Sequence, residues 1–125
     1  MSDLYTYNAK LVRVIDGDTV IAMVDLGFST WKEVRIRFYG IDAYESRTRD
    51  LEEKEKGLQA KALVEQVLKM SEGKFILKSK GVDKYGRSLG ILVIDQVLES
   101  GKVELDLNQH LINEGLAVPY FGGTR

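Results

Sequence analysis

Four carboxylates lie where strands are expected to end: Asp16, Asp18, Asp42 and Glu45. If the first and third strands of the chain are neighbours, Asp18 and Asp42 meet in one anionic pocket. Carboxylates that are crowded together repel one another, and a hard divalent cation between them relieves that repulsion. Taken alone, however, Asp16-Gly17-Asp18 has the ordinary composition of a turn, and a turn is its simpler interpretation.

Two arginines could supply the positive charge that phosphate chemistry needs. Arg37 lies within an apolar strand, where its guanidinium is costly to desolvate unless it meets an anion. That anion could be a phosphate, or it could be Asp42 or Glu45 in a structural salt bridge. Arg87 follows a glycine-bracketed loop at the start of a strand. Beside a bound cation, both arginines would stabilise the charge that develops on the equatorial oxygens of a phosphodiester in its transition state.

The neighbouring residues suggest a group that handles water and a nucleotide site. Glu45 could position or deprotonate the attacking water, or it could be a solvated loop residue. Lys84 and Tyr85 combine a cation with an aromatic ring, which suits a nucleotide that stacks its base and anchors its phosphates. Tyr120 and Phe121 could stack in the same way, or they could pack the open end of the core.

Composition limits the kind of metal site. The chain has no cysteine and a single histidine, His110, so disulfides, thiolate ligands and a histidine-rich metal site are excluded. Any metal must therefore rest on oxygen ligands, which favours calcium or magnesium. We interpret His110, within an expected helix, as structural. We interpret Trp31 as an aromatic residue at a hairpin edge with no chemical role.

Size and charge limit the class of protein. The 125 residues allow one hydrophobic core, and the net charge of -1 argues against a protein that coats nucleic acid through charge alone. No apolar run long enough to span a bilayer and no signal peptide is visible. We therefore expect no membrane association, a monomer, and a cytoplasmic or virus-encoded protein rather than a secreted one.

Five strands and two helices are expected to position these residues. The predicted strands cover 9–15, 19–25, 31–41, 74–80 and 87–94. The first helix follows an exposed, charged loop over residues 46–56, and its apolar spacing is set by Ala60, Leu63, Val64, Val67 and Leu68. A second helix is predicted over 106–114, capped by Asp106 with Gln109 as the reciprocal partner. This order predicts an α+β, mainly β fold: a five-stranded barrel of the oligonucleotide-binding (OB) type, with a helix between strands three and four and a C-terminal helix.

Four stretches of the chain share their order and spacing with one known family. They are Val14-Ile15-Asp16-Gly17-Asp18-Thr19-Val20; Arg37 with Ile41-Asp42 and Glu45; Asp83-Lys84-Tyr85-Gly86-Arg87-Ser88-Leu89; and Leu107-Asn108, Leu111-Ile112 and Gly115-Leu116-Ala117. In this pattern the chain resembles the staphylococcal nucleases. The matching stretches spread from residue 11 to about residue 118.

The resemblance implies an OB barrel that cleaves DNA and RNA with calcium and leaves 3′-phosphate ends. It implies that Asp18 and Asp42 are calcium ligands, that Ala43 contributes a backbone carbonyl, and that Asp16 is an outer carboxylate near the metal.

The resemblance also assigns the groups around the scissile bond. Glu45 matches the general base or water organiser, and Arg37 and Arg87 match the arginines that bind the scissile phosphate. Lys84 and Tyr85 match contacts to the terminal phosphate of a nucleotide, and the family's tyrosine pair matches Tyr120-Phe121 only loosely. Where the family has Thr-Pro, this chain has Ala43-Tyr44, so it lacks proline's restraint on the path to Glu45.

We therefore expect one domain over residues 1–125 that acts as a calcium-dependent nuclease, in which water attacks phosphorus in line with the leaving oxygen. The alternative is a non-catalytic nucleic-acid-binding module on the same barrel. Such modules typically lose the carboxylates or the arginines, and this chain keeps them. A barrel that serves protein–protein contacts would leave both sets of residues unexplained.

Overall fold

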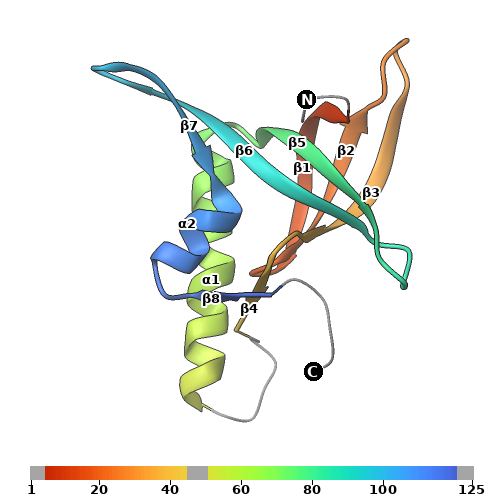
Figure 1. Ribbon diagram of the computed structural model, residues 1–125. Helices are drawn as coiled ribbons and strands as arrows, with labels where there is room; N and C mark the ends of the chain where they lie inside the picture. Colours follow the sequence, from red (N-terminus) through yellow and green to blue (C-terminus); the bar gives the residue numbers. More distant parts are fainter. Residues whose placement is uncertain (1–4, 45–50, 121–125) are drawn as a thin grey trace.

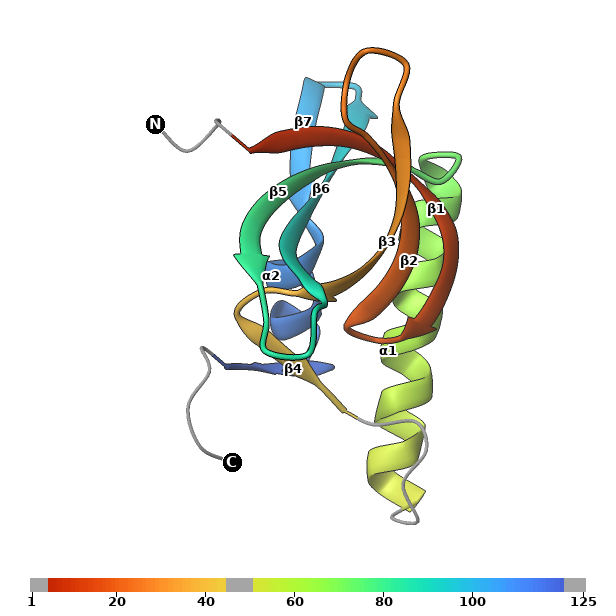
Figure 2. The same cartoon turned by 90° about the vertical axis from the view of Figure 1, so that its right-hand side faces the viewer.

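Strands with alternating apolar residues close into a barrel in the computed structural model, which describes residues 5–44 and 51–120 (Figure 1). In chain order the elements are β1 (Thr6–Asp16), β2 (Thr19–Asp25), β3 (Trp31–Phe38), β4 (Ile41–Ala43), α1 (Leu51–Met70), β5 (Lys74–Val82), β6 (Ser88–Leu98), β7 (Gly101–Asp106), α2 (Leu107–Asn113) and β8 (Ala117–Pro119). The main sheet has the order β3-β2-β1-β5-β6-β7, and a parallel pairing of β3 with β6 closes it into a ring, seen end-on in Figure 2. The predicted five-stranded barrel is confirmed.

The core lies inside this ring and between the ring and the helices. In β2, the buried residues Val20, Ala22 and Val24 alternate with partly exposed ones, the period of two that turns one face of a strand inward. Helix α1 lies alongside β1 (Figure 2) and buries Gly57, Ala60, Val64, Val67 and Leu68. The predicted helical face is therefore confirmed, with Leu63 only partly buried against the core.

The third strand is shorter than predicted. The expected strand over 31–41 ends at Phe38, and a turn through Gly40, whose φ is 80°, separates it from β4. A left-handed φ of this kind is easy for glycine and interrupts a strand. The short β4 then pairs with β8 rather than continuing the barrel wall. Asp42 therefore lies on a separate two-stranded ribbon beside the barrel.

Helix α1 begins earlier than predicted. The sequence predicts a loop over residues 46–56, but residues from Leu51 onward are helical. Glutamate and lysine are good helix formers, and Glu52 and Glu53 lie in the first turn, where the helix dipole favours negative charge. Over residues 51–56, dense mixed charge thus marked the solvated start of a helix and not a loop, while 46–50 lie outside the described residues.

The second helix follows the prediction closely. Asp106 caps α2, and its side chain accepts a hydrogen bond from the backbone N–H of Gln109 at 3.0 Å. The reciprocal contact predicted for the Gln109 side chain is wrong, because its amide nitrogen donates to Oδ1 of Asn113 at 3.1 Å. Before this cap, β6 continues to Leu98 and turns back as β7, a hairpin longer than the strand predicted over 87–94.

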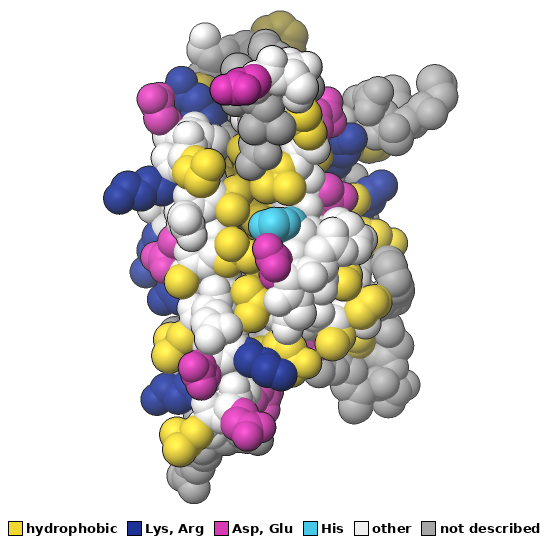
Figure 3. Space-filling model, turned by 90° about the vertical axis from the view of Figure 1, so that its left-hand side faces the viewer, with side chains coloured by type: hydrophobic (Ala, Val, Ile, Leu, Met, Phe, Trp, Pro, Cys, Tyr) yellow, Lys and Arg dark blue, Asp and Glu magenta, His cyan; other side chains and the backbone are white. Residues whose placement is uncertain are grey.

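The two helices share one face of the molecule. Figure 3 shows hydrophobic side chains gathered between them, around a histidine. His110, the single histidine of the chain, is mostly buried on α2, and its Nε2 lies 3.9 Å from Oε1 of Glu114, one turn along the helix. No helix in the described ranges has both the length and the apolar character needed to cross a membrane.

Asn108 ties α2 to the barrel. Its buried amide nitrogen donates to the carbonyls of Tyr39 at 2.8 Å and Gly90 at 3.0 Å, and its amide oxygen accepts from the N–H of Leu92 at 3.2 Å. One side chain therefore satisfies backbone groups of β6 and of the turn between β3 and β4. Because that turn leads to Asp42, Asn108 also fixes the route to the ribbon that carries Asp42.

Replacing Asn108 should destabilise the whole fold. Asn108→Ala removes three hydrogen bonds to the backbone, and only the Gly90 carbonyl is known to keep a second partner, the N–H of Tyr39. We therefore expect the free energy of unfolding to fall by about 2–4 kcal/mol, measured by urea denaturation. Asn113→Ala removes the same side chain from an exposed position of the same helix and serves as the control. Equal losses in the two variants would contradict the role given to Asn108.

Candidate functional site

The guanidinium of Arg37 joins two carboxylates that are distant in the sequence. Its Nη1 lies 3.3 Å from Oδ2 of Asp18, and its Nη2 lies 3.4 Å from Oδ1 of Asp42. The three side chains are only 12–14% exposed. The predicted meeting of the turn after β1 with the end of the β3 region is thus observed. Of the anions suggested for Arg37, Asp42 is in place and forms the expected salt bridge.

Asp18 accepts hydrogen bonds from three residues. Its Oδ1 accepts from the hydroxyl of Thr19 at 3.0 Å, and its Oδ2 accepts from the backbone N–H of Ala43 at 3.0 Å. Its carbonyl accepts from the N–H of Phe38 at 2.8 Å. Side chain and backbone are therefore both fixed before any ligand binds, an arrangement that favours a precise binding site.

Close packing around Gly17 fixes the position of the turn that carries Asp18. Gly17 is buried, and a Cβ placed on it would lie 2.6 Å from Cβ of Ala60 on α1 and 3.1 Å from Cβ of Ala43. The N–H of Gly17 also donates to Oδ1 of Asp16 at 2.9 Å. Glycine is therefore required here by the approach of α1 and β4. The turn composition of Asp16-Gly17-Asp18 reflects this packing as well as chain reversal.

A second cluster lies in the loop between β5 and β6. Oδ2 of Asp83 accepts from Nε of Arg87 at 2.8 Å, while Oδ1 accepts from the N–H groups of Tyr85 and Arg87, each at 2.9 Å. Burial raises the pKa of Asp83, but these hydrogen bonds and the Arg87 charge outweigh it, so the pKa lies below its ordinary value. Asp83 thus shapes the loop as an ion-paired carboxylate.

The same loop exposes a ring flanked by two cations. Tyr85 is 71% exposed, with Nζ of Lys84 5.3 Å from its ring centre and the guanidinium carbon of Arg87 5.4 Å away. The predicted grouping of Lys84, Tyr85 and Arg87 is therefore present. Arg87 is held by Asp83 rather than by the carboxylates that Arg37 joins.

The parallel seam of the barrel relates the two clusters. Arg37 pairs with Leu89 across β3 and β6, and Arg87 lies two residues before Leu89. From ordinary strand spacings, the Cα atoms of Arg37 and Arg87 lie about 8 Å apart. Arg37 on β3 and Arg87 in the loop that leads into β6 can therefore reach a common ligand through their long side chains.

The structure describes only one of the three remaining predicted residues, Tyr120. Tyr120 follows β8, and its N–H donates to the carbonyl of Gly40 at 2.9 Å, close to the start of β4. Glu45 and Phe121 lie outside the described residues, and their roles stay predictions.

Two residues of the site were not singled out from the sequence. Thr19 orients Asp18, and Asp83 holds Arg87. Both lie inside the matching stretches quoted above. Asp83 and Arg87 are four positions apart, and this spacing could have indicated their ion pair from the sequence.

The oxygen donors of the Arg37 cluster are of the type that a hard cation prefers. Asp18 and Asp42 offer carboxylate oxygens, which calcium and magnesium prefer, and thiolate ligands are absent because the chain has no cysteine. Among the described residues, no group of three or more acidic or histidine side chains gathers at one point. An ion held here would therefore complete its coordination with backbone carbonyls, water or a phosphate.

Adding a methyl group at Gly17 should disturb both packing and Asp18. We expect Gly17→Ala to lower the free energy of unfolding by about 1–3 kcal/mol, because the new Cβ overlaps Ala60. The double variant Gly17→Ala with Ala60→Gly should lose less than the sum of the two single variants in urea denaturation. Strict additivity would mean that the two positions are not in contact.

The pairing of Asp83 should appear as pH-dependent stability. A carboxyl group whose pKa is lowered by folding stabilises the protein above its unfolded pKa, about 3.9, and loses this effect as pH falls through the folded pKa. We therefore expect Asp83→Asn to be less stable than the parent from neutral pH down to about pH 5, with the difference shrinking below about pH 4. Urea denaturation at several pH values measures this, with Asp95→Asn, an exposed carboxylate on β6, as the control. A difference that stays constant down to pH 2 would exclude the ionised pair.

Comparison with known proteins agrees with this geometry. Residues 35–124 match the family described as staphylococcal nuclease homologue, a range that contains Arg37, Asp42 and Arg87. The chain is 30% identical over 112 residues to Protein ParB of Escherichia coli, covering 89% of this chain and 56% of that protein. It is 28% identical over 115 residues to Micrococcal nuclease of Shigella flexneri, covering 91% of this chain and 59% of that protein. The chain thus spans somewhat more than half the length of these relatives. Its fold, its paired clusters and the family match lead to one conclusion: this chain belongs to the staphylococcal nuclease family.

Proposed function

We propose that the chain is a calcium-dependent nuclease that hydrolyses phosphodiester bonds of DNA or RNA and leaves 3′-phosphate ends. The observation that carries this proposal is the Arg37 fork shared between Asp18 and Asp42. It provides two buried carboxylates for a hard cation and a guanidinium for a phosphate at one point. The name of the Shigella flexneri relative, Micrococcal nuclease, supports the same activity.

Asp18 and Asp42 would hold the cation, with the carbonyl of Ala43 as a further ligand. The bound ion would supply positive charge to the scissile phosphate and polarise its oxygens. Thr19 and the N–H of Ala43 already fix Asp18 in one orientation, so little reorganisation is needed. Asp16 accepts from the N–H of Gly17 and keeps the turn closed behind the ligands.

The arginines would stabilise the charge that develops on phosphorus oxygens. Each Nη group of Arg37 lies against one carboxylate, and Nη1 also donates to the carbonyl of Phe38 at 3.1 Å. A cation between the carboxylates would take over that charge, and the fork of Arg37 could then bind a phosphate through both Nη groups. The bond from Arg87 to Asp83 uses Nε, so the two terminal nitrogens of Arg87 are not involved in it.

Glu45 would orient or deprotonate the attacking water. The water oxygen bonds to phosphorus, the bond from phosphorus to the 5′ oxygen breaks, and that oxygen leaves with a proton. The phosphate therefore remains on the 3′ side. Lys84 and Tyr85 would hold a neighbouring phosphate and its nucleoside, and Tyr120-Phe121 would contact a base.

Removal of the Arg87 charge tests this assignment. We expect Arg87→Gln to lower the rate of cleavage of single-stranded DNA by about 10²–10³-fold, the loss typical of a group that stabilises transition-state charge. Lys69→Gln, which removes one exposed charge from α1, is the matched control and should retain activity. Cleavage is measured with calcium, magnesium or manganese, and product ends are assigned by their sensitivity to a 3′-phosphatase.

The outcomes separate the competing functions. Full activity of Arg87→Gln would remove Arg87 from the mechanism. Binding of nucleic acid without cleavage under every ion would instead support the non-catalytic module. Products with 5′-phosphate ends would contradict the proposed direction of attack.

A further inference from the structure

A row of cations extends from the site along the outer face of the barrel. Arg35 lies two residues before Arg37 on β3, so both side chains leave the same face of the strand. Arg35 pairs with Ile21 of β2, and Ile21 pairs with Arg13 of β1. Arg13 and Arg35 are both exposed. The two charges therefore flank Ile21 on a surface continuous with Arg37.

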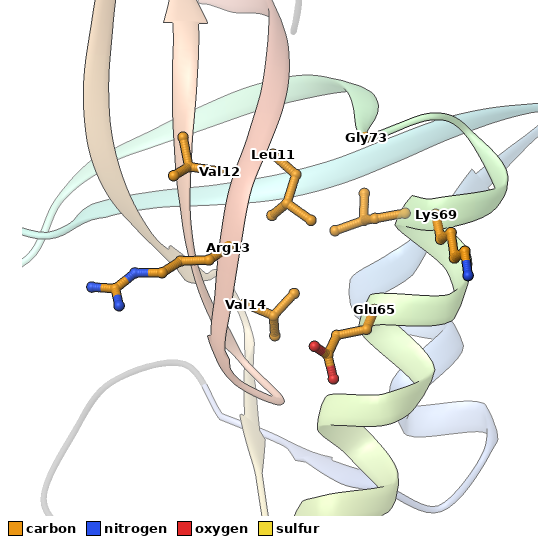
Figure 4. Close-up of a pocket in the computed structure, with 8 residues that line it drawn as sticks. Leu11, Val12, Arg13, Val14, Glu65, Lys69 and Gly73 are labelled. Atoms are coloured by element: carbon orange, nitrogen blue, oxygen red, sulfur yellow. The ribbon is translucent and has the colours of Figure 1, made fainter.

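A bulge in β1 adds a third cation to this face. The register of β1 shifts between Leu11 and Arg13, so Lys10 and Arg13 both point outward although they are three positions apart. Figure 4 shows the result: Leu11 and Val14 point toward α1, and Arg13 points to the opposite side of β1. Without the bulge, the alternation of the strand would direct Arg13 toward the core.

Aromatic rings lie at the far end of the same face. Trp31 begins β3 and is 42% exposed, and Nζ of Lys10 lies 5.6 Å from its ring centre. Phe28, at the tip of the hairpin between β2 and β3, is fully exposed and has a φ of 53°. The exposed rings of Trp31 and Phe28 offer flat faces on which bases can stack.

The charge balance of this face is positive. Lys10 pairs in register with Lys74 of β5, which adds a further exposed cation beside Arg13 and Arg35. Glu33 is an exposed carboxylate on the same face of β3, between Trp31 and Arg35. Asp25 lies opposite Trp31 and accepts from the N–H of Gly27 at 2.9 Å.

We propose that this surface, the outer track (Lys10, Arg13, Phe28, Trp31 and Arg35), binds the single-stranded part of the substrate that extends from the scissile phosphate toward the β2–β3 hairpin. The inference rests on the proposed nuclease function, because Arg37 supplies its starting point. Lys10, Arg13 and Arg35 contact phosphates, and Trp31 and Phe28 stack on bases. Unpaired bases fit this arrangement, since the bases of a duplex are already stacked on one another.

The dimensions suit several nucleotides. Six residues of β3 separate Arg37 from Trp31, which is about 20 Å of strand. Barrels of this type bind roughly 4–16 nucleotides of single strand. A dinucleotide bound at Arg37 would not reach Trp31, whereas a longer strand would. Dependence on strand length is therefore the signature of the outer track.

The single tryptophan of the chain makes this signature measurable without cleavage. Trp31 fluorescence is followed while single-stranded oligonucleotides of 2, 4, 8 and 16 residues are added in EDTA, which blocks turnover. We expect quenching by the longer strands and none by the dinucleotide. A 16-base-pair duplex should quench much less than the single strand. Equal quenching at every length, or none at 16 residues, would overturn the outer track.

Variants then identify the contacts. The double variant Arg13→Gln/Arg35→Gln should weaken binding of the 16-residue strand about tenfold and reduce the slope of log K against log salt by about 1.4, while cleavage of a dinucleotide stays within about twofold. The matched control Lys61→Gln/Lys69→Gln removes two charges from α1. Phe28→Ala should weaken binding of the same strand about fivefold or more, and Leu58→Ala, an exposed apolar residue of α1, should not.

These results distinguish the outer track from the proposed activity. Length-dependent quenching without cleavage under any divalent ion would keep the outer track and reject the nuclease assignment. Cleavage that is unaffected by Arg13→Gln/Arg35→Gln at every strand length would reject the outer track and keep the nuclease.

Discussion

The site depends on one guanidinium that holds two carboxylates from separate turns. Asp18 and Asp42 carry two negative charges against the single positive charge of Arg37, so the three groups together have a charge of about -1. A divalent cation would change this sum to about +1. The cluster would attract a metal ion while no ion is bound, and it would attract a phosphodiester once the ion is bound. Binding of the metal and of the nucleic acid would therefore be linked through Arg37.

Asp18 and Arg87 are held in different ways. Asp18 is fixed by the packing of Gly17 against α1, by Thr19 and by Ala43, all within or next to the barrel. Arg87 instead belongs to a loop whose shape is set mainly by Asp83. Precise placement suits metal ligands, and the Arg87 side chain, which is 33% exposed against 12% for Arg37, is open to a phosphate.

Local patterns predicted most of the elements, and tertiary contacts decided the rest. The alternation of β2, the spacing of α1 and the cap at Asp106 are properties of short segments, so they were visible in the sequence. The break at Gly40 and the small β4–β8 ribbon depend on a partner strand more than seventy residues away, which no short window contains. The clustering of Asp18 with Asp42 was predicted on the condition that the first and third strands are neighbours. That condition is wrong, because β2 lies between β1 and β3, and the turn from β1 to β2 is what brings Asp18 to the end of β3. The hydrogen bond from Arg87 to Asp83 depends on the shape of a loop, and the outward direction of Arg13 depends on a bulge in β1. Neither the loop shape nor the bulge was predicted from the sequence.

The parallel seam between β3 and β6 also shapes how the molecule can be made. Ile36 and Ser88 pair across roughly fifty residues of intervening chain, a long-range contact that is slow to form. Until Ser88 has left the ribosome, the edge of β3 has no partner, and nascent chains that are synthesised close together could join through it. The pairing of β3 with β6 therefore also covers a strand edge that other chains could otherwise join.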